Sequence, residues 1–211
     1  MTTLYFVRHG QSEANVHRVF AGSLDAPLTT LGREQAACTA AYLADKPISA
    51  VYASDLQRAA DTGSAISSVK AIPLHTTRQL REIRAGSWEG KCFDELQNDA
   101  AYQVWLHTIG LAQCTDGESV AQLQQRIKAV VEDIVRAHPD EHICIATHAT
   151  PIRVMEAVWT GTPLERMHTI PWVSNASVTI AEYGNDGIGR LVSRDMSDHM
   201  GCIQSVLPSN V

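Results

Sequence analysis

The chain has 211 residues, of which 45% are hydrophobic and 19% charged, with a formal net charge of −6 and a pI near 5.8. This length supports one sizeable core, and we predict a single domain over residues 1–211. The acidic balance, without a basic run, argues against a nucleic-acid or anionic-membrane surface.

The N-terminus lacks the charged and apolar regions of a leader peptide, and no stretch has the apolar length of a membrane span. We therefore expect a soluble, cytoplasmic protein. The five cysteines are widely spaced, odd in number and never paired as C-x-x-C. Neither a disulfide framework nor a zinc site is expected, and Cys144 is interpreted as a buried thiol.

The first expected strand covers residues 4–7 and ends abruptly at Arg8, His9 and Gly10. An alanine-rich helix over 30–44 follows, with Thr30 as its predicted N-cap.

A second strand is expected at 48–53. Ser54 and Gln57 then have the spacing of a capping box, so a helix should begin immediately after this strand. A weaker strand signal lies at 71–75.

Ser119 and Gln122 repeat the capping-box spacing before an amphipathic stripe of about five turns. Beyond it we expect a strand at 142–147, a helix started by Thr150 and Pro151, and a helix end at Gly161. The last two strands, at 177–183 and 190–194, should form a hairpin through the segment YGNDG.

Strands that alternate with helices predict an α/β fold: a three-layer α/β/α sandwich with a mostly parallel sheet of about six strands and one antiparallel edge strand. Residues 1–90 and 117–205 should form the core. Residues 91–116 have no clean period and are interpreted as a cap-like excursion.

Charged and polar residues follow three of the predicted strands at their carboxyl ends. Arg8 and His9 end the first strand, Arg58 follows the second, and His148 follows the strand at 142–147. Ligands bind at this edge of an open α/β sheet, where helix N-termini also favour anions. We expect these four residues to converge on a phosphate, which arginine binds through its planar fork.

Six segments in order, RHGQSEAN, LTTLGREQA, YASDLQRAADT, LREIRAGSWEG, DGES and ATHATPIR, cover nearly the whole chain. Together they resemble the histidine phosphatase superfamily, in its phosphoglycerate mutase-like branch. The resemblance implies that His9 is the nucleophile that forms a phosphohistidine. It assigns the phosphoryl oxygens to Arg8, Asn15, Arg58 and His148, and proton donation to Glu82.

The chemistry of these residue types is consistent with this assignment. An imidazole must be neutral to attack, and the neighbouring Arg8 and Arg58 should lower the pKa of His9. Fixed cations stabilise the transition state, so no metal is obligatory. Glu82 must be protonated, which requires partial burial, and it would then act as base on the incoming water.

Two residues differ from the family pattern. Ala149 follows the second histidine where glycine is common in relatives, and its backbone N–H is preserved as a phosphate donor. Gln11 replaces a common glutamate, which removes one negative charge beside the pocket.

Each site residue also has a structural interpretation, because single histidines and arginines at such positions are more often hydrogen-bonded or solvated than catalytic. The sequence lacks the motifs of other phosphatase classes. No cysteine precedes an arginine in the C-x5-R spacing of cysteine phosphatases. Neither the D-x-D motif of aspartyl-nucleophile enzymes nor the ligand cluster of two-metal enzymes occurs. A non-enzymatic phospholigand-binding relative is a further alternative, which the presence of His9 and Glu82 disfavours.

The main alternative is a phosphoglycerate mutase that depends on a 2,3-bisphosphoglycerate primer; a hydrolase needs no cofactor. The 26 residues between Gly90 and Gly117 contain Lys91 as their sole Lys or Arg. We therefore favour a small phosphomonoester whose leaving group is neutral or partly apolar. Contacts are expected from Tyr102, Trp105, Leu106 or Ile109. If the protein is a mutase, Arg84 and Arg153 are the first candidates for the missing cations.

The protein should be a monomer or homodimer.

Overall fold

Residues 1–205, which the computed structural model describes, contain one six-stranded sheet in the order β3-β2-β4-β1-β5-β6. The strands are β1 Thr2–Arg8, β2 Ile48–Ser54, β3 Leu74–Thr77, β4 His142–Thr147, β5 Val178–Tyr183 and β6 Gly189–Met196. The first four are mutually parallel, whereas β5 runs against both β1 and β6. The predicted fold class, with antiparallel pairing at one edge, is confirmed.

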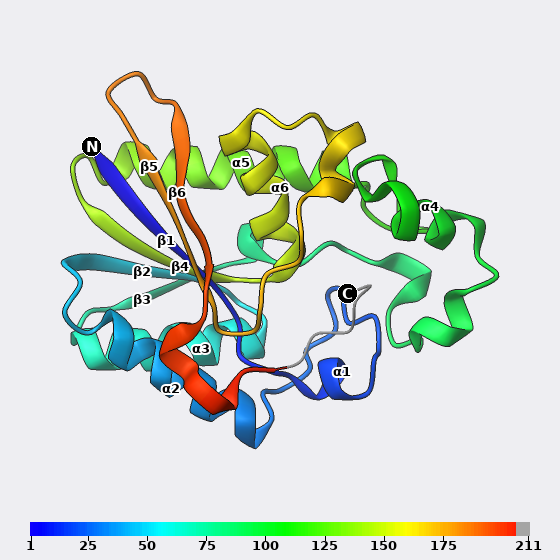
Figure 1. Cartoon of the computed structure of the whole chain (residues 1–211), viewed down its shortest axis with the longest axis horizontal. Coiled ribbons are helices and arrows are strands. Elements are labelled where there is room, and N and C mark those ends of the chain that lie inside the picture. Colours follow the sequence, from blue (N-terminus) through cyan, green and yellow to red (C-terminus); the bar gives the residue numbers. More distant parts are fainter. Residues whose placement is uncertain (206–211) are drawn as a thin grey trace.

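Helices cover both faces of this sheet. They are α1 Glu13–Val16, α2 Thr30–Leu43, α3 Gln57–Lys70, α4 Ala100–Thr108, α5 Val120–Ala137 and α6 Ala149–Thr160. Figure 1 shows α2 and α3 on one side of the sheet and α5 and α6 on the other. Short 3₁₀ helices lie at Arg78–Leu80, Gly86–Trp88, Phe93–Leu96, Ile109–Leu111, Leu164–Thr169 and Asp198–Ile203.

The alternation of side chains along β1 explains why two helical layers are needed. Leu4 and Phe6 pack into a cluster with residues of α5 and α6, whereas Tyr5 and Val7 pack into a second cluster with residues of α2 and α3. Successive residues of a strand point to opposite faces, so a strand that is apolar throughout must be covered on both.

Some predicted helix starts are wrong. Thr29, not Thr30, caps α2, because its side chain accepts a hydrogen bond from the Gly32 amide. Ser54 ends β2 and does not cap α3, whose N-cap Leu56 makes no side-chain hydrogen bond. The physical reason is that the chain is still extended at Ser54 and the helix begins only at Gln57; the Ser54 hydroxyl contacts His148 and accepts from the Leu56 amide.

Other predicted helix ends agree with the structure. The capping box of Ser119 and Gln122 is confirmed at the start of α5. Gly161 ends α6 at a φ of 66°, as predicted. However, His148 is the N-cap of α6, so Pro151 is its third residue and not its first.

The segment 91–116 contains α4 and lies beyond the carboxyl ends of the strands (Figure 1). Its side chains Tyr102, Trp105 and Ile109 are buried and extend the core cluster of α5 and α6. This segment therefore forms part of the wall around the carboxyl edge of the sheet.

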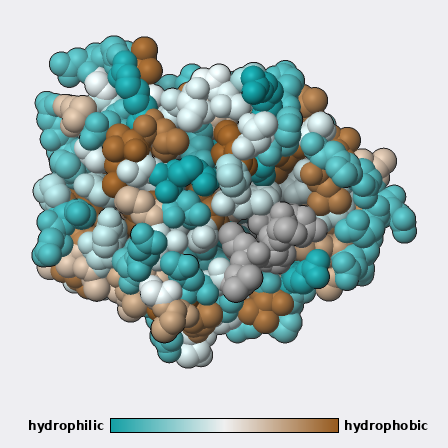
Figure 2. All heavy atoms as spheres, viewed as in Figure 1, coloured by the Kyte–Doolittle hydropathy of each residue, from teal (hydrophilic) through white to brown (hydrophobic). Residues whose placement is uncertain are grey.

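Figure 2 shows one face of the molecule, on which hydrophobic residues form small groups between hydrophilic ones. Within residues 1–205, no helix has both the length and the apolar character to cross a membrane. The five cysteines are free thiols, and Cys144 is buried as predicted.

Candidate active site

A pocket opens at the carboxyl ends of the parallel strands. It contains six of the seven predicted site residues, all except His148. Its lining residues are Arg8, His9, Ser12, Asn15, Val19, Phe20, Ala21, Gly22, Arg58, Glu82, Phe93, Tyr102, Trp105, Ala149, Thr150 and Trp172. The topology explains the convergence, since β2, β4 and β1 are adjacent and parallel, so that the residues after each strand meet at one edge.

The ring of His9 is held in a defined tautomer. Its Nδ1 lies 2.7 Å from the Gly10 carbonyl oxygen, which only accepts, so Nδ1 carries the proton. Nε2 of the neutral ring then has a free lone pair. Burial lowers the pKa of His9 well below its usual value, and the charges of Arg58 and Arg8 lower it further. His9 is therefore neutral, and so nucleophilic, at neutral pH.

Arg8 and Arg58 are anchored by backbone carbonyls. Arg8 Nη1 donates to the Val173 oxygen at 2.5 Å, and Arg58 donates to the Leu24 and Gly22 oxygens at 2.8 and 3.0 Å. Within the described chain, Arg8 Nε is buried without a partner. Burial lowers the pKa of Arg8 to about 10, so it stays cationic at neutral pH. Both side chains are rigid cations with donors left for an anion.

Glu82 lies in the same pocket as a half-buried residue, with its carboxylate turned inward to two backbone amides. One oxygen accepts from the Ile83 amide at 2.7 Å and the other from the Thr150 amide at 3.2 Å. Burial raises the pKa of Glu82 above its usual value, although these hydrogen bonds act in the opposite direction. A carboxyl group of raised pKa can hold a proton for a leaving group.

Asn15 presents its amide nitrogen to the pocket, because its oxygen is already engaged. Asn15 Oδ1 accepts from the Ser12 amide, the Ser12 hydroxyl and Asn175 Nδ2 at 3.0, 3.1 and 3.2 Å. Asn175 also donates to the His9 carbonyl at 3.1 Å. The sequence analysis missed Ser12 and Asn175. Ser12 could have been found from its N-cap position, but Asn175 lies in no recognisable motif.

His148 lies behind His9 and does not line the pocket. The two ring centroids are 5.2 Å apart, and His148 is fully buried. Its Nε2 lies 2.8 Å from Ser54 Oγ. Burial, followed by the charge of Arg58, lowers its pKa well below the usual value. The next residue, Ala149, brings the N-terminus of α6 to the pocket, where its amides favour an anion.

Aromatic rings form the outer wall. Phe20 makes edge-to-face contacts with Trp88, Phe93, Tyr102 and Trp105 at centroid distances from 5.2 to 6.5 Å. Trp172 extends this wall, since its ring centroid lies 6.3 Å from that of Trp105. Tyr102 and Trp105 were expected here, whereas Phe20, Phe93 and Trp172 were missed.

Of the four alternatives expected to contact the leaving group, Leu106 and Ile109 are not among the lining residues. Ile109 is buried in the core instead. Arg153 is also directed away, since it donates to the Ile170 and Met167 carbonyls and lies 4.2 Å from the Trp172 ring. Neither it nor Arg84 lines the pocket.

The fold and this site together define a protein with a cationic pocket in which two arginines lie beside a neutral imidazole and a carboxyl group. A sequence model of the histidine phosphatase superfamily (branch 1) matches residues 4–195, and the chain belongs to that superfamily. The resemblance inferred from its motifs is confirmed.

Individual relatives support the same assignment. Glucosyl-3-phosphoglycerate phosphatase of Mycolicibacterium vanbaalenii is 31% identical, over 82% of this chain and 81% of that protein. Phosphoserine phosphatase 1 of Hydrogenobacter thermophilus is 26% identical, over 85% of this chain and 86% of that protein. The solved structure of Bacillus stearothermophilus YhfR has a TM-score of 0.90 at 32% identity, and the match covers 95% of this chain and 100% of that one.

Proposed function

We propose that this chain hydrolyses phosphomonoesters of small metabolites through a phosphohistidine on His9. The observation that carries the proposal is the His9–Gly10 hydrogen bond, which leaves Nε2 as the reactive atom in a pocket shared with two arginines and Glu82. The named relatives act on small phosphorylated metabolites, which supports the same reaction class.

In the first half-reaction, Arg8, Arg58, Asn15 and the Ala149 amide hold the phosphoryl oxygens. His9 Nε2 attacks phosphorus as the bond to the leaving oxygen breaks, and Glu82 transfers its proton to that oxygen. Fixed cations stabilise the charge that spreads over the equatorial oxygens. His148 supports the pocket from behind His9.

In the second half-reaction, the Glu82 carboxylate takes a proton from a water molecule. This water attacks the phosphohistidine, the bond between nitrogen and phosphorus breaks, and inorganic phosphate leaves with neutral His9 restored. Glu82 is protonated again, so the enzyme returns to its starting state.

The pocket wall supports a leaving group that is neutral or partly apolar. Among the lining residues within 1–205, Arg8 and Arg58 are the only Lys or Arg side chains, and both serve the phosphoryl group in this mechanism. The carboxylate of a phosphoglycerate would face aromatic rings, and an unpaired buried charge costs several kcal/mol. A phosphatase is therefore favoured over a bisphosphoglycerate-primed mutase.

The test is a phosphate-release screen over a panel of phosphomonoesters in EDTA, with mutase products measured alongside. Activity should survive EDTA, because protein groups supply the charge stabilisation, and vanadate should inhibit. Strict dependence on an added divalent metal would contradict the mechanism, and primed interconversion of phosphoglycerates faster than any hydrolysis would reverse the preference for a phosphatase. A cytoplasmic location and a monomeric or homodimeric state stay predictions from the sequence.

A further inference from the structure

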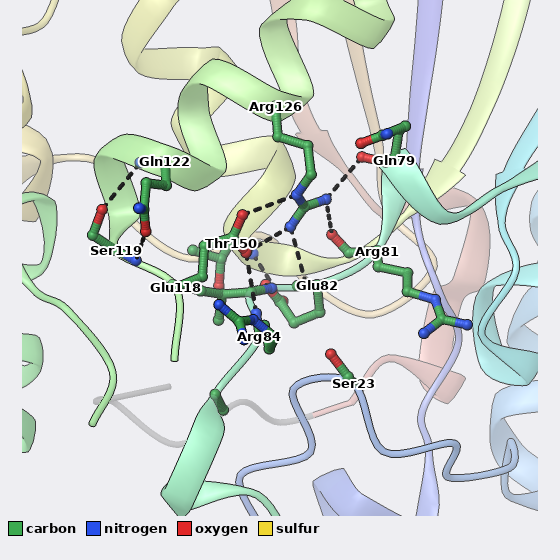
Figure 3. A network of polar contacts seen from close by, with 12 residues as sticks. Ser23, Gln79, Arg81, Glu82, Arg84, Glu118, Ser119, Gln122, Arg126 and Thr150 are labelled. Atoms are coloured by element: carbon green, nitrogen blue, oxygen red, sulfur yellow. Dashed lines mark hydrogen bonds and ion pairs between the residues drawn. The ribbon is translucent and has the colours of Figure 1, made fainter. Parts of the chain in front are cut away.

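The proposed reaction leaves one sequence motif, DGES at residues 116–119, without a role. Glu118 of this motif forms a bidentate ion pair with Arg126 on α5. Arg126 Nε lies 2.9 Å from Glu118 Oε1, and Nη2 lies 2.8 Å from Oε2. Both side chains are largely buried, so the pair is shielded from solvent (Figure 3).

The other side of the Arg126 guanidinium binds the backbone that carries Glu82. Nη1 donates to the carbonyl oxygens of Gln79 and Arg81 at 2.8 and 3.0 Å. Nη2 donates to the Glu82 carbonyl oxygen at 3.3 Å. With the two bonds to Glu118, these contacts use all five N–H donors of the side chain.

Glu118 holds the same segment from its other end. Its Oε2 accepts from the Arg84 amide at 3.1 Å, and its own amide donates to the Arg84 carbonyl at 2.8 Å. The two backbones are so close that a Cβ at Gly117 would lie 2.4 Å from the Arg84 oxygen. Figure 3 shows Glu82 between the two held ends of this segment.

We propose that Glu118 and Arg126 are positioning residues that fix the reach of Glu82 to the leaving oxygen. The inference rests on the proposed function, because it requires Glu82 to be the proton donor. Proton transfer needs hydrogen-bond distance, and a displacement of about 1 Å can cost about a hundredfold in rate. Within residues 1–205, Glu82 is the one pocket-lining residue to which the pair hydrogen-bonds, so its effect should depend on how much proton donation the leaving group needs.

The test compares phenyl phosphate with p-nitrophenyl phosphate, whose leaving group departs with little protonation. The variant Arg126→Lys keeps the charge but lacks the five-donor fork. Its kcat/KM for phenyl phosphate should fall at least about tenfold, and that for p-nitrophenyl phosphate by less than about threefold. Glu82→Gln should show the same pattern, and the double variant should show no further loss, since both substitutions act through one group.

The matched control is Lys128→Ala, which removes an exposed ion pair with Glu132 on the same helix and should leave both rates unchanged. Stability is separated from positioning by Glu118→Leu combined with Arg126→Met. Apolar replacement avoids an unpaired buried charge, but it leaves the carbonyls that Arg126 binds without their donor, so this variant should melt below the wild-type temperature. Assayed well below its melting temperature, where it is folded, it should still show the selective loss.

Three outcomes would each overturn the inference. The first is an equal loss of kcat/KM on both substrates, and the second is an additive loss when Arg126→Lys is combined with Glu82→Gln. The third is a wild-type rate on phenyl phosphate in the apolar variant. If Glu82→Gln itself shows no dependence on the leaving group, the acid role of Glu82 fails, and the inference fails with it. If Glu82→Gln shows the pattern and Arg126→Lys does not, only the positioning inference fails.

Discussion

His148 Nε2 lies 2.8 Å from Ser54 Oγ, at the buried junction of β2 and α6. The Leu56 amide donates to the same hydroxyl oxygen at 3.3 Å. A hydroxyl has two lone pairs and one hydrogen, so Ser54 can accept from Leu56 and still hydrogen-bond with Nε2. Within residues 1–205, Nδ1 is buried without a partner, so the contact with Ser54 is the side-chain hydrogen bond that orients the His148 ring behind His9.

Ser54→Ala should therefore lower kcat/KM by roughly tenfold, equivalent to about 1.4 kcal/mol, because it removes the hydrogen bond that orients the His148 ring against His9. The measurement is steady-state hydrolysis of an aryl phosphate. Ser49→Ala is the matched control, since Ser49 lies on the same strand but is exposed and bonded to Glu141. Equal rates in the two variants would exclude this role for Ser54.

The pH dependence of activity should report Glu82. Burial raises its pKa, and the proton must be present for donation, so wild-type activity should fall as pH rises through this value. Glu82→Gln lacks the titrating group, whereas both proteins share the titrations of substrate and His9. The ratio of kcat/KM between wild type and Glu82→Gln on phenyl phosphate should thus decrease toward alkaline pH. A ratio that stays constant from about pH 5 to 9 would remove Glu82 from the acid role.

The pH dependence of stability should report the buried histidines. Burial lowers the folded-state pKa values of His9 and His148 well below the ordinary value of 6.5. The unfolded chain therefore binds more protons below about pH 6.5, so the stability that these groups contribute is present above that pH and is lost as pH falls. Each contributes at most about 1.4 kcal/mol per pH unit.

The change in the free energy of unfolding with pH can be measured by urea unfolding from about pH 7 to 5. Glu82 contributes with the opposite sign, because its raised folded pKa gives stability that is lost as pH rises through it. The comparison of wild type with His9→Gln cancels that contribution, and the variant should lose less stability on acidification. Identical slopes would mean that His9 is not held neutral in the folded protein.

Substrate preference should follow the aromatic wall. A neutral aryl phosphate should be hydrolysed with a kcat/KM at least about tenfold above that for 3-phosphoglycerate, a difference of about 1.4 kcal/mol. Trp172→Ala should reduce this difference by lowering kcat/KM for the aryl phosphate, because Trp172 lines the pocket and its ring packs against Arg153. A preference for 3-phosphoglycerate in the wild type would show that other groups bind its carboxylate.

Motifs at strand ends were sufficient to predict the fold and several of the polar residues that meet at the carboxyl edge of the sheet. Arg8, His9 and Arg58 follow adjacent parallel strands, and strand alternation with helices left few other topologies. The roles of these residues stay predictions. The capping box at Ser54 was misleading because the strand continues to Ser54 and the helix begins only at Gln57, where local spacing cannot show how far the tertiary pairing of β2 extends.

The aromatic wall was harder to predict. Phe20, Phe93 and Trp172 are in loops or short helices whose positions depend on long-range packing, and no local period marks them. Asn175 was missed for the same reason: it reaches His9 and Asn15 across more than 150 residues of sequence. Local patterns carry no signal for such contacts.

The most direct test of the central mechanism is to locate the covalent phosphate. Wild-type protein is mixed with an aryl phosphate, quenched within one turnover, and mapped by peptide mass spectrometry. Phosphate that is labile in acid and stable in base should be found on His9, and His9→Ala should give neither this intermediate nor turnover while keeping its fold. Covalent phosphate on a cysteine or a carboxylate, or full turnover by His9→Ala, would contradict the mechanism.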